Sequence, residues 1–267
     1  MERELPTINI EKTEFEVDVN RFELREKNNP SNAISLFDMR DLGRHDGYVF
    51  EYSLNEKNIP SMFMRSETVM VKIPELVILD PIGMSEKYGV PIEMLNTTND
   101  FHLMVNQGAL EKRLAGHLPI VEIAGHPFYV DLRMDMLRPK DDFLSQGIVF
   151  SKIEDFYIEE KSEYAIPYNP KTHEFQQIDL SSITEIPKDI IVVSFPHENV
   201  LDPIGYNRKY GLGEMANLKE RNLQSHFKAG AVSWKETGIP EVIRENKANS
   251  LKNEIPRDKN KKKGSKL

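Results

Sequence analysis

Apolar residues occupy every second position in two separate stretches of the chain. The first stretch has a polar break at residues 11–14 and the second has one at residues 124–127. A period of two places the apolar side chains on one face of an extended strand, so each stretch predicts a β-hairpin with one buried face. The alternating residues are Ile8, Ile10, Phe15, Val17 and Val19 in the first stretch and Val121, Ile123, Phe128, Val130 and Leu132 in the second.

Further strands are predicted downstream of each hairpin. Alternation returns at residues 48–52 and 69–73, and again at residues 164–168. Residues 169–172 read Asn-Pro-Lys-Thr, which predicts the turn of another hairpin. Residues 189–195 are almost continuously apolar, as is typical of a central strand.

A short capped helix is predicted twice, at residues 79–89 and 201–211. Both segments read Leu-Asp-Pro-Ile-Gly-x-x-x-Lys-Tyr-Gly. An Asp N-cap, a Pro at the first helical position and a Gly in the left-handed conformation at the end are the expected signals of such a helix. The predicted structural caps are Asp80, Pro81, Gly89, Asp202, Pro203 and Gly211.

Longer helices are expected after each capped helix. The first is amphipathic, is capped by Asp100 and ends near Gly116. Its counterpart over residues 222–234 is less regular, and a last helix is expected over residues 240–251.

The two halves of the chain repeat one another. Residues 5–27 and 118–140 share nine of 23 positions at an offset of 113, and the two capped-helix segments share eight of 11 at an offset of 122. The tyrosines at 48 and 52 match those at 164 and 168, and Gly108-Ala109 matches Gly230-Ala231. Four blocks in the same order predict a tandem duplication of one small domain.

We therefore predict an α+β fold in which each copy is an antiparallel sheet of about five strands followed by helices. The first repeat spans residues 1–117 and the second spans residues 118–238. Residues 239–267 are expected to form a C-terminal helix and a disordered, Lys-rich tail. No Gly/Ser-rich or Pro-rich linker separates the copies, so two lobes packed with pseudo-twofold symmetry are expected.

Composition narrows the class of protein. The chain has 267 residues and no cysteine, which excludes disulfides and thiolate chemistry. The acidic, polar N-terminus is unlike a signal peptide, and no run reaches the roughly 18 apolar residues of a membrane span. We expect a cytoplasmic protein with no membrane partner.

Charge is unevenly distributed along the chain. The formal net charge is −8, but residues 257–267 hold six basic residues and one acid, which leaves −13 for residues 1–256. An acidic body repels phosphate, so only the tail is expected to contact nucleic acid, and weakly.

No catalytic or metal motif is present. The seven histidines show no H-x-x-H or H-E-x-x-H spacing, and no P-loop, G-x-G-x-x-G or G-x-S-x-G occurs. We expect no cofactor and no catalytic residue. A zinc site made by His117, His126 and Asp131 is an outside candidate, because a strand pair could bring the two histidines together.

Polar residues kept in both copies are the best candidates for binding. The candidate binding residues are Arg25, Arg138, Lys87, Lys209, Tyr88 and Tyr210. The alternative for the arginines is structural, because Asp18 and Asp131 are also duplicated and would pair with them inside each copy.

The motif LPxxxIAGxxFYVDxRxxxLRPKDD at residues 118–142, together with VLDPIGYNRKYGL at residues 200–212, resembles a family of Bacteroidetes proteins that has no assigned activity and is often carried on mobile elements. The resemblance extends to about residue 237. It implies a bacterial cytoplasmic setting and an accessory role, and it supplies no catalytic residues.

Three functions remain open. A non-enzymatic module that presents both lobes to a protein partner is favoured by duplication without a catalytic constellation. An enzyme or small-ligand binder would place its site between the lobes, with Asp131, His126, Arg138 and Tyr210 as candidate groups. An accessory of a nucleic-acid system would use the basic tail as an anchor or the acidic body as a DNA mimic.

Overall fold

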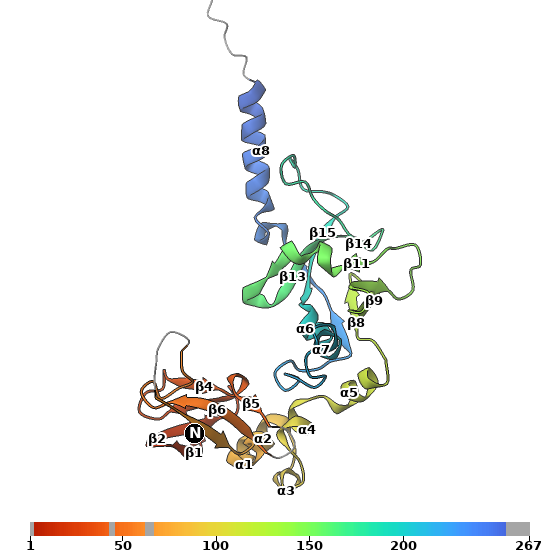
Figure 1. The fold of residues 1–267 in the computed structure, drawn as a ribbon. Coiled ribbons are helices and arrows are strands. Elements are labelled where there is room, and N and C mark those ends of the chain that lie inside the picture. The colour runs from red at the N-terminus through yellow and green to blue at the C-terminus, as the bar shows by residue number, and fades with distance from the viewer. Residues whose placement is uncertain (1–2, 43–45, 62–66, 255–267) are drawn as a thin grey trace, which may run out of the picture. The chain divides into compact units, whose positions relative to one another are not determined.

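The computed structural model describes residues 3–42, 46–61 and 67–254 of the chain (Figure 1). The chain divides into two compact units. Unit 1 comprises residues 1–115 and 213–223, and unit 2 comprises residues 116–212 and 224–267. Each unit has a hydrophobic core of its own, one drawn from residues 10–104 and the other from residues 121–227.

Unit 1 contains two antiparallel sheets. The first has the order β1-β2-β3-β4, and its alternating pattern buries Phe15 and Val17 as expected from the period of two. The second has the order β5-β6-β7. The strands are β1 (Thr7–Ile10), β2 (Thr13–Asp18), β3 (Glu23–Glu26), β4 (Ala33–Ser35), β5 (Arg40–Asp41), β6 (Tyr48–Ser53) and β7 (Thr68–Ile73).

The helices of unit 1 follow its second sheet. They are α1 (Leu76–Leu79), α2 (Pro81–Tyr88), α3 (Ile92–Leu95), α4 (Asp100–Met104) and α5 (Gln107–Leu114). The expected cap of α2 is confirmed, because the Asp80 carboxylate accepts a hydrogen bond from Gly83 N at 2.9 Å and Gly89 ends the helix with φ = 65°.

Unit 2 also contains two sheets, of orders β11-β10-β9-β8-β16 and β12-β13-β15-β17, with β14 paired to β13. The strand predicted at residues 189–195 is confirmed as β15, in the middle of the second sheet. The strands are β8 (Ile120–Ile123), β9 (His126–Asp131), β10 (Met136–Pro139), β11 (Ile148–Val149), β12 (Tyr157–Ile158), β13 (Glu163–Asn169), β14 (Glu174–Phe175), β15 (Ile191–Pro196), β16 (His226–Lys228) and β17 (Gly230–Val232).

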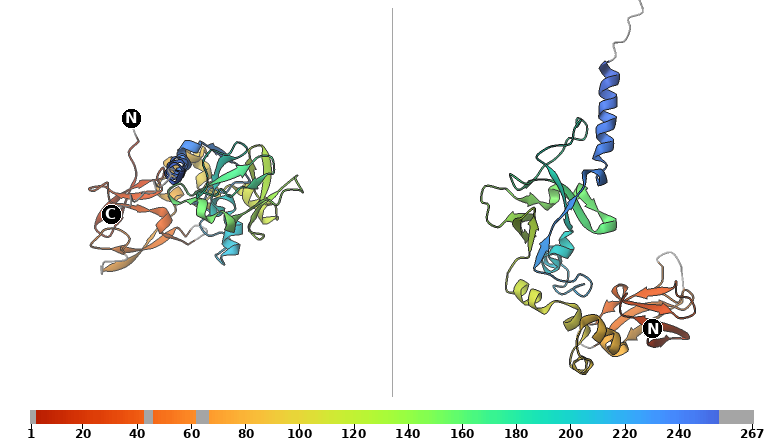
Figure 2. Two further views of the ribbon diagram at one scale, coloured as in Figure 1. Left: turned by 90° about the horizontal axis from the view of Figure 1, so that it is seen from above. Right: turned by 180° about the vertical axis from the view of Figure 1, so that it is seen from behind.

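The helices of unit 2 are α6 (Glu198–Leu201), α7 (Pro203–Lys209) and α8 (Ile239–Glu254). Asp202 caps α7 through Gly205 N at 2.9 Å, as Asp80 caps α2. Helix α8, the predicted last helix, stands out from the sheets of its unit in the right-hand view of Figure 2. The Asn246 side chain ties it to the loop before β15 by donating to Leu180 O and Ile183 O. No helix in the described residues is long and apolar enough to span a membrane.

Each unit has two sheets where one sheet of about five strands was expected. Short 3₁₀ helices interrupt the chain between the sheets. In unit 1 the Ser35 side chain accepts a hydrogen bond from Phe37 N at 3.2 Å and caps such a helix (Leu36–Asp38). In unit 2 two of them (Phe150–Lys152 and Glu154–Phe156) separate β11 from β12. After these turns the following strands form a second sheet in each unit, except for β16, which pairs with β8 of the first sheet.

Two predicted helices are wrong in detail. The helix expected from Asp100 to about Gly116 is broken at Val105, which is extended, because the Asn106 side chain caps a new helix by accepting from Ala109 N at 3.0 Å. Asn99 rather than Asp100 caps the first piece. The helix expected over residues 222–234 is replaced by β16 and β17, because both pair with strands distant in sequence.

The pairing of β2 with β3 and the pairing of β9 with β10 place matching residues in matching positions. Val17 faces Leu24 in unit 1, and Val130 faces Leu137 in unit 2. All four side chains are buried in the core of their unit. The same local sequence therefore makes the same register in both units.

Candidate functional site

The outer edge of β1 has no partner strand in the described part of the chain. Val17 N donates to Pro6 O at 2.8 Å. Hydrogen-bonded and non-hydrogen-bonded pairs alternate along an antiparallel ladder, so the backbone N–H and C=O groups of Thr7 and Asn9 point away from β2. Both residues are exposed. Among residues 3–42, 46–61 and 67–254, no strand pairs with this edge.

The corresponding edge of unit 2 is closed by β16. Ile120 and Glu122 lie 113 residues after Thr7 and Asn9 and point outward in the same way. Ile120 N donates to Ser225 O at 3.1 Å, and Ala229 N donates to Glu122 O at 2.8 Å. Strand β16 thus runs parallel to β8 and satisfies backbone groups whose counterparts in unit 1 face no other strand of the described ranges.

The extra strand also changes the burial of the core. Phe227, the central residue of β16, belongs to the core of unit 2, and Val121 on β8 is fully buried. Ile8 occupies the position of Val121 in unit 1 and is only half-buried against its core. The open edge of β1 therefore lies beside apolar surface that a neighbouring side chain would cover.

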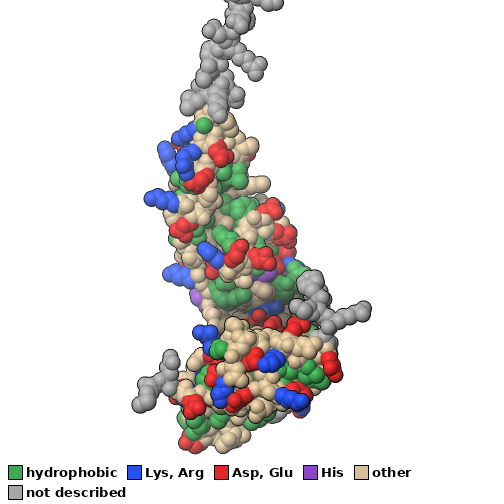
Figure 3. All heavy atoms as spheres, turned by 90° about the vertical axis from the view of Figure 1, so that its left-hand side faces the viewer, with side chains coloured by type: hydrophobic (Ala, Val, Ile, Leu, Met, Phe, Trp, Pro, Cys, Tyr) green, Lys and Arg blue, Asp and Glu red, His purple; other side chains and the backbone are tan. Residues whose placement is uncertain are grey.

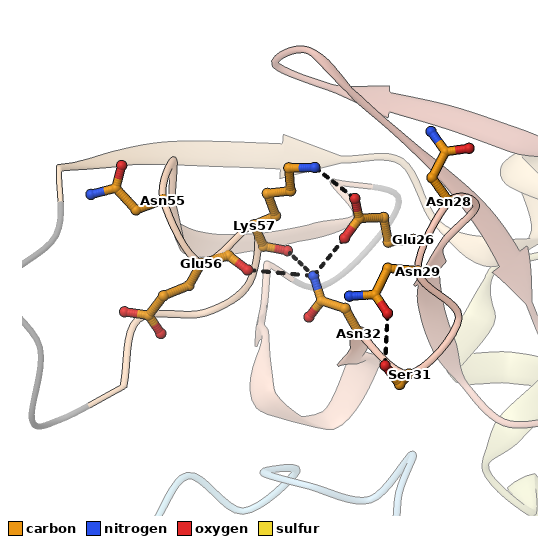
Figure 4. A pocket seen from close by; sticks show the side chains of 8 residues that line it. All are labelled: Glu26, Asn28, Asn29, Ser31, Asn32, Asn55, Glu56 and Lys57. Carbon is orange, nitrogen blue, oxygen red and sulfur yellow. Dashed lines mark hydrogen bonds and ion pairs between the residues drawn. The ribbon is translucent and has the colours of Figure 1, made fainter.

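A second feature is the loop corner, which is formed in unit 1 by residues 26–33 and 53–57. The Lys57 ammonium lies 2.7 Å from Glu26 Oε1, and the Asn32 amide donates to Glu26 Oε2 at 3.0 Å (Figure 4). These two hydrogen bonds lower the pKa of Glu26. An open pocket of about 590 Å³ lies here, lined by Glu26, Asn28, Asn29, Ser31, Asn32, Asn55, Glu56 and Lys57.

The loop corner of unit 2 is formed by residues 139–147 and 169–174, and it carries different chemistry. His173 takes the position of Lys57: both have positive φ, 58° and 52°, and each backbone N–H donates to the residue four earlier at 2.9 Å. His173 Nδ1 lies 2.8 Å from Asp142 Oδ2. The His126 ring, from the start of β9, stacks on the His173 ring at 3.7 Å between centroids. Potential ligand atoms of His126, Asp142 and His173 all lie within 4.8 Å of one another.

The electrostatics of this trio favour the neutral form of His126 and the ionised form of Asp142. Burial and the neighbouring His173 lower the pKa of His126. The hydrogen bond with His173, together with the Leu144 amide, lowers the pKa of Asp142. The Nε2 atom of His126 is buried and has no hydrogen-bond partner within the described chain. These groups are able to ligate a cation.

The structure does not assemble the zinc candidate of His117, His126 and Asp131. His126 and Asp131 lie at opposite ends of β9, and a strand rises about 3.3 Å per residue, which separates them by roughly 17 Å. Asp131 instead lies 3.4 Å from Arg138 Nε. The sequence pattern missed Asp142 and His173 because their loops meet only in the folded unit.

The duplicated arginines make contacts within their own units. Arg25 pairs with Asp18 at 3.2 Å, as Arg138 does with Asp131. Glu23 also accepts hydrogen bonds from Arg25. The predicted ion pair between each arginine and the aspartate of its own unit is therefore confirmed. A role of the arginines in binding stays a prediction.

The duplicated Lys-Tyr pairs differ between the units. Lys87 donates to Val19 O at 2.8 Å and Asn20 O at 3.0 Å, whereas Lys209 pairs with Asp135 at 2.8 Å and Glu198 at 3.1 Å. Burial raises the pKa of Tyr88 to about 12, and Tyr210 is more than half exposed. Both lysines thus hold a helix against their own unit.

Charge is mixed on the face shown in Figure 3, where acidic and basic side chains are interspersed without a broad basic area among the coloured atoms. The basic tail at residues 257–267 lies outside the described residues. No protein-family model, no curated protein and no solved structure matches the chain.

Proposed function

We propose that the chain is a non-enzymatic interaction module that binds an extended segment of a protein partner at the open edge of β1. The observation that carries this proposal is the contrast between the two units: β16 occupies the outer edge of β8, and the equivalent edge of β1 is open in the described residues. Addition of a strand to an exposed sheet edge is a common mode of peptide recognition.

We infer the chemistry of the partner from β16, because this strand occupies the edge of unit 2 that is equivalent to the β1 edge. Its His-Phe-Lys sequence is exposed, buried and exposed in turn. A ligand of β1 would run parallel to it, with backbone groups bonding Thr7 and Asn9 and with one large apolar side chain covering Ile8. The acidic body of the chain favours partners with basic residues beside that apolar one.

The duplication is part of the same proposal. Matching registers at Val17 and Val130, and matching caps at Asp80 and Asp202, support descent of the two units from one ancestral domain. The pseudo-twofold packing of the lobes, the cytoplasmic location and the origin on a mobile element stay predictions. An enzyme site between the lobes and a nucleic-acid role for the tail also stay predictions.

A labelled peptide with the sequence of residues 223–232 tests the proposal. Fluorescence anisotropy should show binding to the full chain, and Asn9→Pro should weaken it by more than about tenfold, because proline removes the outward N–H and is tolerated only at sheet edges. Asn9→Thr, which keeps the N–H and suits a strand, is the matched control.

Circular dichroism checks that both variants are folded. Equal binding by the Pro variant and the wild type, or no binding by the wild type, would contradict the proposal. Hydrogen exchange supplies a second measurement, in which the amides of Thr7 and Asn9 exchange fast in the free protein and the Ile120 amide is protected.

A further inference from the structure

We propose that His126, His173 and Asp142 form a binding site for one divalent transition-metal ion, with Zn²⁺ the best match. The site lies wholly within unit 2 and does not depend on strand binding at β1. Two imidazoles and one carboxylate form a donor set that zinc uses with a fourth position left open.

The first argument comes from the loop corner of unit 1. There the Lys57 ammonium supplies a permanent cation to the Glu26 carboxylate. In unit 2 the same backbone position carries His173, and the groups that act on the Asp142 carboxylate are His173 and backbone amides. The lysine that faces the carboxylate in unit 1 is thus replaced by a histidine in unit 2, and a metal ion bound there would supply the positive charge that Lys57 supplies in unit 1.

The second argument is the state of His126. Its Nε2 atom is buried and has no hydrogen-bond partner in the described chain, although such an atom normally has one. A metal ion would use a nitrogen lone pair that is otherwise left without a partner. His126 sits on β9 and holds one ligand in place, while His173 and Asp142 come from loops that can adjust.

The two loops are already tied together. Ser145 Oγ donates to His173 O at 3.0 Å, and Gln146 N donates to Glu174 Oε1 at 2.8 Å. The Leu144 amide donates to Asp142 Oδ1 at 2.9 Å and orients the carboxylate. Such supporting contacts hold ligands in a metal site. The rings are stacked at 10°, so coordination turns one of them until both nitrogens point to a common centre.

The proposed metal would also hold an exposed loop. Phe143 and Leu144 directly follow Asp142, and each is 95% exposed. Coordination by Asp142 would restrict this loop and the two apolar side chains at its tip. Faster hydrogen exchange at residues 143–146 in the metal-free protein is therefore expected.

The test uses the purified, chelator-treated full chain and metal salts alone. Isothermal titration with ZnCl₂ should give one site per chain, and Co²⁺ should give the visible absorption of a tetrahedral complex. His173→Lys, which places the ammonium of unit 1 in this corner, should keep the fold and weaken Zn²⁺ binding by more than about tenfold, and Asp142→Asn should also weaken it. His117→Gln, an exposed histidine of the same unit, is the control and should bind as the wild type does.

Circular dichroism establishes that each variant is folded. The proposal is overturned if the wild type binds no Zn²⁺, if His173→Lys binds it equally well, or if His117→Gln loses as much affinity. Because no peptide is present, failure here leaves the strand-binding result unaffected.

Discussion

Units 1 and 2 share two hairpins and a capped helix. They differ at the outer edge of the first sheet and in the group that faces the carboxylate of the loop corner. Unit 2 closes the edge of its first sheet with β16 but has no fixed cation beside Asp142 among its described contacts. Unit 1 neutralises Glu26 with Lys57, and the edge of its β1 is open in the described residues. The difference teaches that similar hairpins can end in different surroundings: a sheet edge is covered in unit 2, and one loop corner holds a lysine where the other holds a histidine.

The largest expected effect comes from removing the strand that distinguishes the units. Phe227→Ala should lower the free energy of unfolding of unit 2 by about 3–5 kcal/mol, because it deletes a large core side chain and loosens β16 from β8. Urea unfolding with a probe in each unit measures this. Ile8→Ala, at a half-buried position of unit 1, should cost clearly less, and equal losses would contradict the comparison.

The next effect tests whether the β2–β3 pairing of unit 1 and the β9–β10 pairing of unit 2 are equivalent. Leu24 and Leu137 are both buried and face Val17 and Val130, so Leu24→Ala and Leu137→Ala should each cost about 2–3 kcal/mol. Hydrogen exchange in β2 and β9 measures each unit separately, since two units need not unfold together. A large loss of stability in only one variant would show that the matching strand pairs contribute unequally to the stability of their units.

The smallest effect is a pH dependence confined to unit 2. The pKa of His126 is lower in the folded state, so the unfolded state takes up the proton first as the pH falls. The contribution of neutral His126 to the free energy of unfolding of unit 2 is complete above about pH 6.5, the ordinary pKa of histidine. It is lost as the pH falls from there toward the pKa of the folded state. Thermal unfolding between pH 8 and pH 5 measures it.

His126→Thr places in unit 2 the residue that Thr13 supplies at this position in unit 1. It should flatten this part of the pH profile. An unchanged profile in that variant would assign the effect to other groups.

Interactions between near neighbours in sequence were predicted well. The hairpin turns and the N-caps Asp80 and Asp202 depend on groups a few residues apart, so their signals are contained in short segments. The break at Val105 was missed although its cause is also local, because a side-chain cap at Asn106 competes with continuation of the helix.

The candidate sites depend on contacts between distant segments. Asp100 was assigned to a helix cap, but its buried carboxylate accepts hydrogen bonds from Leu76 N, Val77 N and the Tyr48 hydroxyl. His126 was identified as a possible ligand with the wrong partners, because Asp142 and His173 are brought to it by two different loops.

The sequence by itself determined the alternating strands, the capped helices and the correspondence between the two halves, because periodicity and capping act over a few residues. Tertiary structure alone decided that residues 226–228 form a strand on β8, that no described strand covers the equivalent edge of β1, and that two histidines and an aspartate meet in one corner. Those outcomes depend on which distant backbone groups find partners and which loops fold over one another, and no local pattern encodes that choice.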